Sequence, residues 1–145
     1  MITYNTINVA MPDIAEAEVS AWVRRVARAY DKVIGDINYI FVDDETILDI
    51  NRRFIGHDYY TDHIGFDYSQ AGALSGDIYI SIDTVRSNAG QYGATFGEEL
   101  RRIIIHGLLH LCGLRDKTPE ERALMQKAED EALKAIHNSQ FIIHN

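Results

Sequence analysis

The sequence predicts an α+β fold in which a small mixed β-sheet of about four strands is layered with about five helices. Three observations predict it. Segments rich in β-branched and aromatic residues alternate with segments whose apolar residues recur at helical spacing. A composition of 46% hydrophobic and 25% charged residues is that of an ordinary globular protein. The length of 145 residues is typical of one domain, so we expect residues 1–145 to share a single core.

The first half of the chain predicts a long helix, a strand and a shorter helix. Apolar residues recur at helical spacing from Asp13 to Val33. The β-branched and aromatic run over residues 37–42 predicts a largely buried strand. Asp43 or Asp44 then caps a helix that Gly56 ends.

The middle of the chain predicts a hairpin followed by a short helix. Residues 61–68 and 76–81 are the two strands, and the Gly-containing segment 69–75 joins them. A short helix over residues 82–90 follows.

Two capping boxes define the C-terminal third. Thr95 and Glu98 open an apolar helix that runs to Cys112, and Gly113 stops it. Thr118 and Glu121 open a second helix with Pro in its first position. The two helices are therefore joined by a tight turn over residues 113–117.

Charge and cysteine usage limit the classes of function. The net charge is −8 and the pI about 5.1, which argues against a protein that holds nucleic acid by bulk electrostatics. The basic residues do cluster, and we interpret the clusters as solvated helix faces; they are Arg24-Arg25-Arg28, Arg52-Arg53 and Arg101-Arg102. A single cysteine allows no internal disulfide, and no apolar run is long enough to span a membrane, so we expect a cytoplasmic protein.

The strongest chemical signal is a pair of histidines in the first C-terminal helix. His106 and His110 lie four residues apart, so both imidazoles share one helix face and can converge on one zinc ion. Asp116 is the nearest third ligand, because Gly113 lets the chain fold back toward that face. Three protein ligands leave the fourth position open, as in catalytic zinc sites. Cys112 points to the opposite side of the helix and is expected in the core.

A zinc-bound water has a lowered pKa and can attack a phosphoryl or acyl centre at neutral pH. In zincin proteases a glutamate follows the first histidine and serves as general base. Here that position is Gly107, so a peptidase would lack its proton acceptor. Phosphodiester cleavage suffers less, since Lewis acidity and positioning supply much of the acceleration.

The segment His106–Gly113 closely resembles the signature helix of the YbeY family. Other pieces follow in the right order: Asn51-Arg52-Arg53-Phe54, Thr61-Asp62 with Phe66, and Gly76-Asp77-Ile78. The resemblance implies a metal-dependent, single-strand-specific endoribonuclease that acts in 16S rRNA 3′-end maturation and ribosome quality control. It also implies one Zn²⁺, with other divalent metals possible, held by the histidine pair and one ligand after the Gly turn.

The chain departs from the family pattern at two positions. The third family ligand is usually His, whereas the matching residue here is Asp116; zinc accepts a carboxylate oxygen, which can broaden the choice of metal. The family commonly places an Arg where this chain has Ile55. If that Arg contacts the scissile phosphate, Arg53 or Arg52 is a nearby replacement, and Arg53 is our catalytic candidate.

Three further residues are candidates for contact with the substrate. Strand alternation puts His63 on the face opposite Ile64, where it could touch a phosphate, but an exposed strand histidine is the simpler expectation. Tyr59 and Tyr60 could stack on single-stranded bases.

The sequence thus favours a metallohydrolase domain whose zinc is held by His106, His110 and Asp116. RNA is the expected partner, presented by the ribosome or by a protein partner because the net charge of −8 disfavours free RNA. No DNA or membrane partner is expected. Two alternatives stay open: a zinc-dependent peptidase, and a non-enzymatic ribosome assembly factor in which zinc only joins the last two helices.

Overall fold

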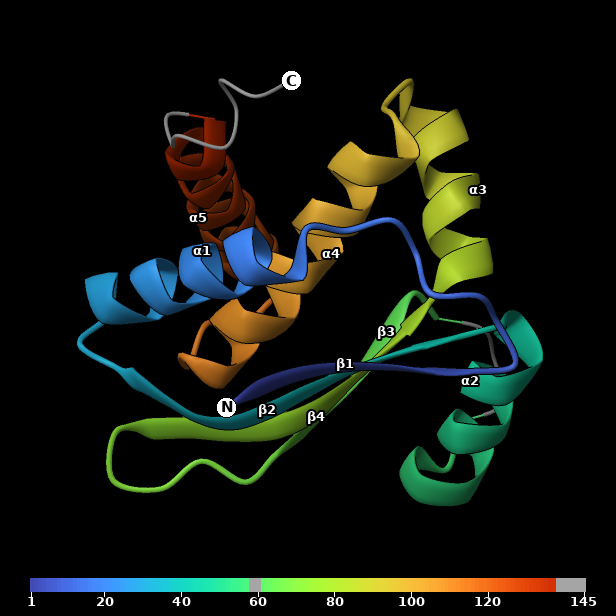
Figure 1. The fold of residues 1–145 in the computed structure, drawn as a ribbon, viewed down its shortest axis with the longest axis horizontal. Helices are drawn as coiled ribbons and strands as arrows, with labels where there is room; N and C mark the ends of the chain where they lie inside the picture. The colour runs from blue at the N-terminus through green and yellow to red at the C-terminus, as the bar shows by residue number, and fades with distance from the viewer. Residues whose placement is uncertain (58–60, 138–145) are drawn as a thin grey trace.

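The computed structural model describes residues 1–57 and 61–137, and Figure 1 shows its arrangement. In chain order the elements are β1 (Ile2–Ile7), α1 (Glu16–Ala29), β2 (Val33–Val42), α2 (Asp44–Ile50), a π-helical turn (Asn51–Ile55), β3 (His63–Asp67), β4 (Ala73–Ser81), α3 (Ile82–Tyr92), α4 (Phe96–Leu111) and α5 (Pro119–His137). The described residues therefore form four strands and five α-helices, and the predicted fold class is confirmed. No helix within the described ranges is long and apolar enough to cross a membrane.

The four strands form one mixed sheet in the order β1-β2-β4-β3. β2 pairs in parallel with both β1 and β4, and β3 pairs with β4 as the predicted antiparallel hairpin. The helices α1, α3, α4 and α5 cover one face of the sheet, and α2 covers part of the other face (Figure 1). Side chains of β2 alternate accordingly: Tyr39 and Phe41 belong to the main core, whereas Ile40 and Val42 pack in the smaller one.

The first third of the chain differs from the expectation in two main ways. The sequence pattern predicts no strand before residue 13, whereas in the structure β1 pairs over its full length with β2. The helix expected to reach Val33 ends at Ala29, since Asp31 adopts a left-handed backbone with φ of 58° and Val33 already begins β2.

Helix α4 lies at the centre of the main core and fixes the position of the histidine pair. Its buried apolar side chains pack against the sheet and against α1, α3 and α5. The hydroxyl of Tyr39 on β2 donates to the carbonyl of Ile104 at 3.1 Å. A Cβ atom on Gly107 would lie 3.0 Å from the side chain of Ile78, so the missing side chain lets α4 approach β4 closely. The face of α4 that carries the histidines is thereby held against the sheet.

Candidate metal centre

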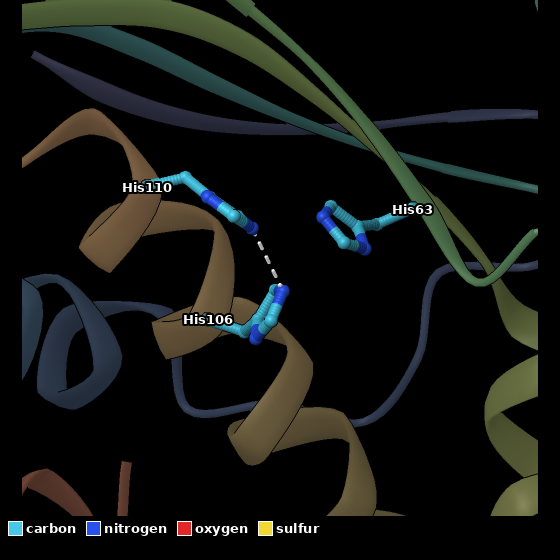
Figure 2. Close-up of side chains that lie close together, drawn as sticks. All are labelled: His63, His106 and His110. Carbon is cyan, nitrogen blue, oxygen red and sulfur yellow. Dashed lines mark hydrogen bonds between the residues drawn. The ribbon is translucent and has the colours of Figure 1, made fainter. Parts of the chain in front are cut away.

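The histidine pair lies on α4, as predicted. The capping box at the start of the helix is present: Thr95 accepts from the backbone of Glu98, whose side chain accepts from the backbone of Thr95. The Nε2 atoms of His106 and His110 lie 3.0 Å apart, and Figure 2 shows the two rings converging. The i, i+4 spacing therefore places both ring nitrogens at one point.

Asp116 reaches the same point through the turn after α4. Gly113 adopts φ of 105°, and the backbone N–H of Leu114 donates back to the carbonyl of Leu109. The Oδ2 atom of Asp116 then lies 3.2 Å from Nε2 of His110 and 3.3 Å from Nε2 of His106. The chain folds back as the sequence predicted.

The three atoms form a triangle with the dimensions of a zinc site. Two ligands bound to zinc at about 2.0–2.1 Å in tetrahedral geometry lie about 3.3–3.4 Å apart. The observed separations of 3.0, 3.2 and 3.3 Å are close to that edge length. His106, His110 and Asp116 therefore present three donor atoms at separations close to those of a tetrahedral zinc site.

The hydrogen bonds of the two rings give an independent argument for a cation. Nδ1 of His110 contacts the carbonyl of Leu114 at 3.0 Å, and a carbonyl can only accept, so Nδ1 carries the proton. Nδ1 of His106 likewise faces a carboxylate oxygen of Glu129 at 2.6 Å. In their neutral forms both rings thus direct an Nε2 lone pair at each other and at Asp116. Three acceptors this close repel one another unless a metal ion or an extra proton lies among them.

A third imidazole joins the centre from the sheet. His63 on β3 offers a ring nitrogen that, with those of His106 and His110, forms a group whose ligand atoms all lie within 4.8 Å of one another. Its ring is 4.7 Å from that of His106, centroid to centroid, and Figure 2 shows it pointing toward the pair. The side chain is only 18% exposed, so the expectation of an exposed strand histidine was wrong. Strand alternation predicts which face of the strand carries His63, but only tertiary packing brings that face against α4.

His63 is oriented by its neighbour in sequence. Its Nδ1 atom lies 2.9 Å from a carboxylate oxygen of Asp62, so Nε2 is the nitrogen left for the centre. Burial raises the pKa of Asp62, but the hydrogen bond and the charge of His63 outweigh burial and bring this pKa below its ordinary value. Asp62 therefore stays ionised and holds the ring.

The two rings of α4 have pKa values shifted in opposite directions. Burial lowers the pKa of His106, yet the hydrogen bond and charge of Glu129, with the charge of Asp116, raise it above its ordinary value. Burial, together with the neighbouring His106, keeps the pKa of His110 below its ordinary value although Asp116 opposes this. Nearby carboxylates thus favour the protonated form of His106, whereas burial and the charge of His106 disfavour the protonated form of His110.

A carboxylate that the sequence did not reveal supports His106. Glu129 on α5 is buried, and its other oxygen accepts from Arg102 at 2.7 Å. Arg102 also donates to Asp130 at 2.8 Å, so it does not belong to a solvated helix face as expected. Glu129 lies 23 residues after His106, and no local pattern marks that contact.

The remaining predicted residues lie elsewhere. Arg53 is 70% exposed on the π-helical turn and pairs with Asp49 at 3.0 Å. That turn follows α2, which packs on the sheet face opposite α4. Cys112 packs against the main core, as predicted, and burial raises the pKa of its thiol to about 11. Tyr59 and Tyr60 lie outside the described residues.

Fold and site together define a class: α+β proteins that carry, between a sheet and its central helix, a histidine cluster able to hold a metal ion. The family model described as endoribonuclease YbeY matches residues 5–137. A Bacteroides thetaiotaomicron protein named Endoribonuclease YbeY is 54% identical over 132 residues, which are 91% of this chain and 96% of that protein. A Phocaeicola vulgatus protein of the same name is 52% identical over 136 residues, 94% of this chain and 99% of that protein.

The chain belongs to the YbeY family of endoribonucleases, a family of hydrolases, as the signature helix indicated. Among solved structures, the solution structure of TM1509 from Thermotoga maritima is similar with a TM-score of 0.63. Its sequence identity is 22%, and the match covers 97% of each chain, so it supports the fold alone.

Proposed function

We propose that this protein is a metal-dependent endoribonuclease whose single domain binds one divalent ion through His106, His110 and Asp116. The observation that carries the proposal is the triangle of 3.0, 3.2 and 3.3 Å formed by their facing atoms. Membership of the YbeY family supplies the class of reaction and, with it, RNA as substrate.

The donor set suits zinc, because two imidazoles and one carboxylate are among its usual ligands. When bound, such an ion would supply Lewis acidity toward the phosphate and lower the pKa of a water molecule. The residues of this chain hold the donors in place: Glu129 and the carbonyl of Leu114 fix the Nε2 atoms of the pair toward the centre. His63 and its partner Asp62 border the open side and offer a further donor or a group that can exchange a proton.

We further propose a single-stranded RNA substrate in 16S rRNA 3′-end maturation and ribosome quality control, in the cytoplasm. This proposal is supported by membership of the YbeY family and by a composition that is acidic overall. A net charge of −8 disfavours capture of free RNA, so delivery of the substrate by a ribosomal particle or protein partner fits the chain better.

The packing around Gly107 argues against the peptidase alternative. A side chain at position 107 would meet Ile78 of β4 instead of the metal centre, so the zincin base has no place there. One observation favours the assembly-factor alternative. His63 brings the number of nearby protein donors to four, which is the number in structural zinc sites.

Metal analysis combined with an RNA-cleavage assay tests the proposal. We expect His110→Ala to lose the metal and the cleavage of unstructured RNA while its circular dichroism spectrum stays that of a folded protein. His57→Ala, which changes an exposed loop histidine, is the matched control and should keep both. Equal metal content in His110→Ala and wild type would end the metal hypothesis. A wild-type protein that melts much lower after chelation but never cleaves RNA would favour the assembly factor.

A further inference from the structure

A cavity of about 590 Å³ adjoins the candidate metal centre. It is bounded by the end of α3, by α4 and by α5, and its wall includes His106 and Asp116. Its volume lies within the range of about 300–1,000 Å³ that is usual for small-ligand pockets. The space is therefore large enough for a nucleotide unit, and two of the three residues proposed to hold the metal form part of its wall.

Two arginines line this cavity, and they differ in their partners. Arg102 is held by Glu129 and Asp130, so its charge is already neutralised. Arg122 is exposed, and its Nη1 donates to the main-chain carbonyl of Lys117 at 2.8 Å. Among the residues that the structure describes, no carboxylate lies within ion-pair distance of Arg122. One N–H of its guanidinium is therefore engaged, and the remaining N–H groups can donate to a ligand.

We infer that this cavity receives a nucleotide beside the scissile bond and that Arg122 binds a phosphate of the RNA backbone there. A guanidinium matches the geometry of a phosphate better than any other side chain. Arg122 would then perform the task for which the sequence suggested Arg53. Arg53 instead forms an ion pair with Asp49 and lies in the turn after α2, which packs on the sheet face opposite α4. This inference rests on the proposed function.

An exposed tyrosine on the same wall suits the base of that nucleotide. Tyr92, the last residue of α3, is 67% exposed and lines the cavity. An aromatic ring can stack on an unpaired base of any identity, with a contribution of about 1–3 kcal/mol per base. Bases within a duplex are already stacked, so such a contact would favour single-stranded RNA.

The acidic residues on the wall do not prevent phosphate binding. Glu129 is balanced by Arg102 and His106, and Asp116 faces the histidine pair. The third acidic residue of the wall, Glu99, is buried, and burial raises the pKa of its carboxyl group. Arg122 thus carries the cationic character of the outer wall.

RNA binding without turnover tests the inference. Fluorescence anisotropy of a labelled 12-nucleotide single-stranded RNA, in EDTA and at several salt concentrations, reports binding separately from cleavage. We expect Arg122→Gln to weaken binding about tenfold and to reduce the salt slope by about 0.7, the loss of one phosphate contact. Arg122→Lys should restore much of the slope, and Arg53→Gln should bind like wild type. Thermal melting of each variant confirms that it is folded.

A matched tyrosine pair tests the stacking contact. Tyr92→Ala should weaken binding about five- to tenfold, whereas Tyr92→Phe keeps the ring and the affinity. Tyr68→Ala, which removes another exposed tyrosine that does not line the cavity, should have no effect. Wild-type affinity in both Arg122→Gln and Tyr92→Ala, in a protein that cleaves RNA, would overturn the inference alone. A wild-type protein that cleaves no RNA, either free or presented within ribosomal particles, would overturn the proposed function itself.

Discussion

The Nδ1 atom of His106 lies 2.6 Å from Oε2 of Glu129, and this contact joins α4 to α5 beside the candidate metal centre. Because Nδ1 is engaged, Nε2 is the nitrogen that faces His110 and Asp116. The other oxygen of Glu129 is held by Arg102, which limits the motion of the carboxylate. A contact between two helices therefore sets both the tautomer and the orientation of a proposed metal ligand.

Replacing the supporting carboxylate should weaken metal binding without removing a ligand. We expect Glu129→Gln to lower zinc affinity by about 10- to 100-fold, since loss of such an outer partner typically has this effect. Competition with a chromophoric chelator measures the affinity. Asp130→Asn is the control, because it also removes a carboxylate charge beside Arg102 but leaves His106 untouched. An equal loss in both variants would show that Arg102, not the contact to His106, is responsible.

The relative importance of Asp116 and His63 can be decided by single substitutions. Asp116 fits the tetrahedral triangle, so Asp116→Ala should reduce zinc affinity by more than about 100-fold. His63 lies farther out, and His63→Ala should cost about tenfold or less. The same chelator competition measures both. The reverse order would mean that the three imidazoles form the coordination sphere and that Asp116 only orients them.

Two glycines of α4 should respond oppositely to the same substitution. A Cβ at Gly107 would lie 3.0 and 3.1 Å from buried side-chain atoms of Ile78, so Gly107→Ala should lower the free energy of unfolding by about 1–2 kcal/mol despite the better helix propensity of Ala. At Gly97 a Cβ would meet only the end of the Arg101 side chain at 3.7 Å. Gly97→Ala should therefore stabilise the protein by up to about 1 kcal/mol. Urea denaturation measures both, and destabilisation of equal size would contradict the role of the close approach.

The buried phenol of Tyr39 should make stability depend on alkaline pH. Burial raises the pKa of Tyr39 well above its ordinary value of 10.0. Above pH 10 the unfolded chain releases this proton while the folded protein keeps it, so the free energy of unfolding falls as the pH rises further. Tyr39→Phe should cost about 1 kcal/mol at neutral pH, through loss of the bond to Ile104, and should flatten the decline above pH 10. Denaturation at a series of pH values checks this, and an unchanged slope would be the opposing result.

The sequence predicted those features of the site that depend on neighbours along the chain. His106 and His110 share a face because of helical spacing, and Asp116 returns to them because Gly113 permits a left-handed turn. The capping residues Thr95 and Thr118 were found for the same reason, since each bonds a group three residues away. These contacts are local, and local geometry follows from residue type and spacing.

The partners that complete the site come from other elements, and the sequence did not indicate them. His63 reaches the pair only because β3 lies at the sheet edge beneath α4. Glu129 reaches the pair, and Arg122 lines the adjoining cavity, only because α5 packs along α4. Arg53, favoured by its closeness to a motif in the chain, lies beyond the sheet.

The sequence by itself determined the fold class, the helix that carries the histidines and the identity of the nearest third donor. Tertiary structure decided which side chains orient those donors, which imidazole stands opposite them and which arginine lines the adjoining cavity. The physical reason is that the direction of a side chain within one helix or turn is set by backbone geometry. Contacts between elements are set instead by how apolar faces pack, and that depends on the whole chain at once.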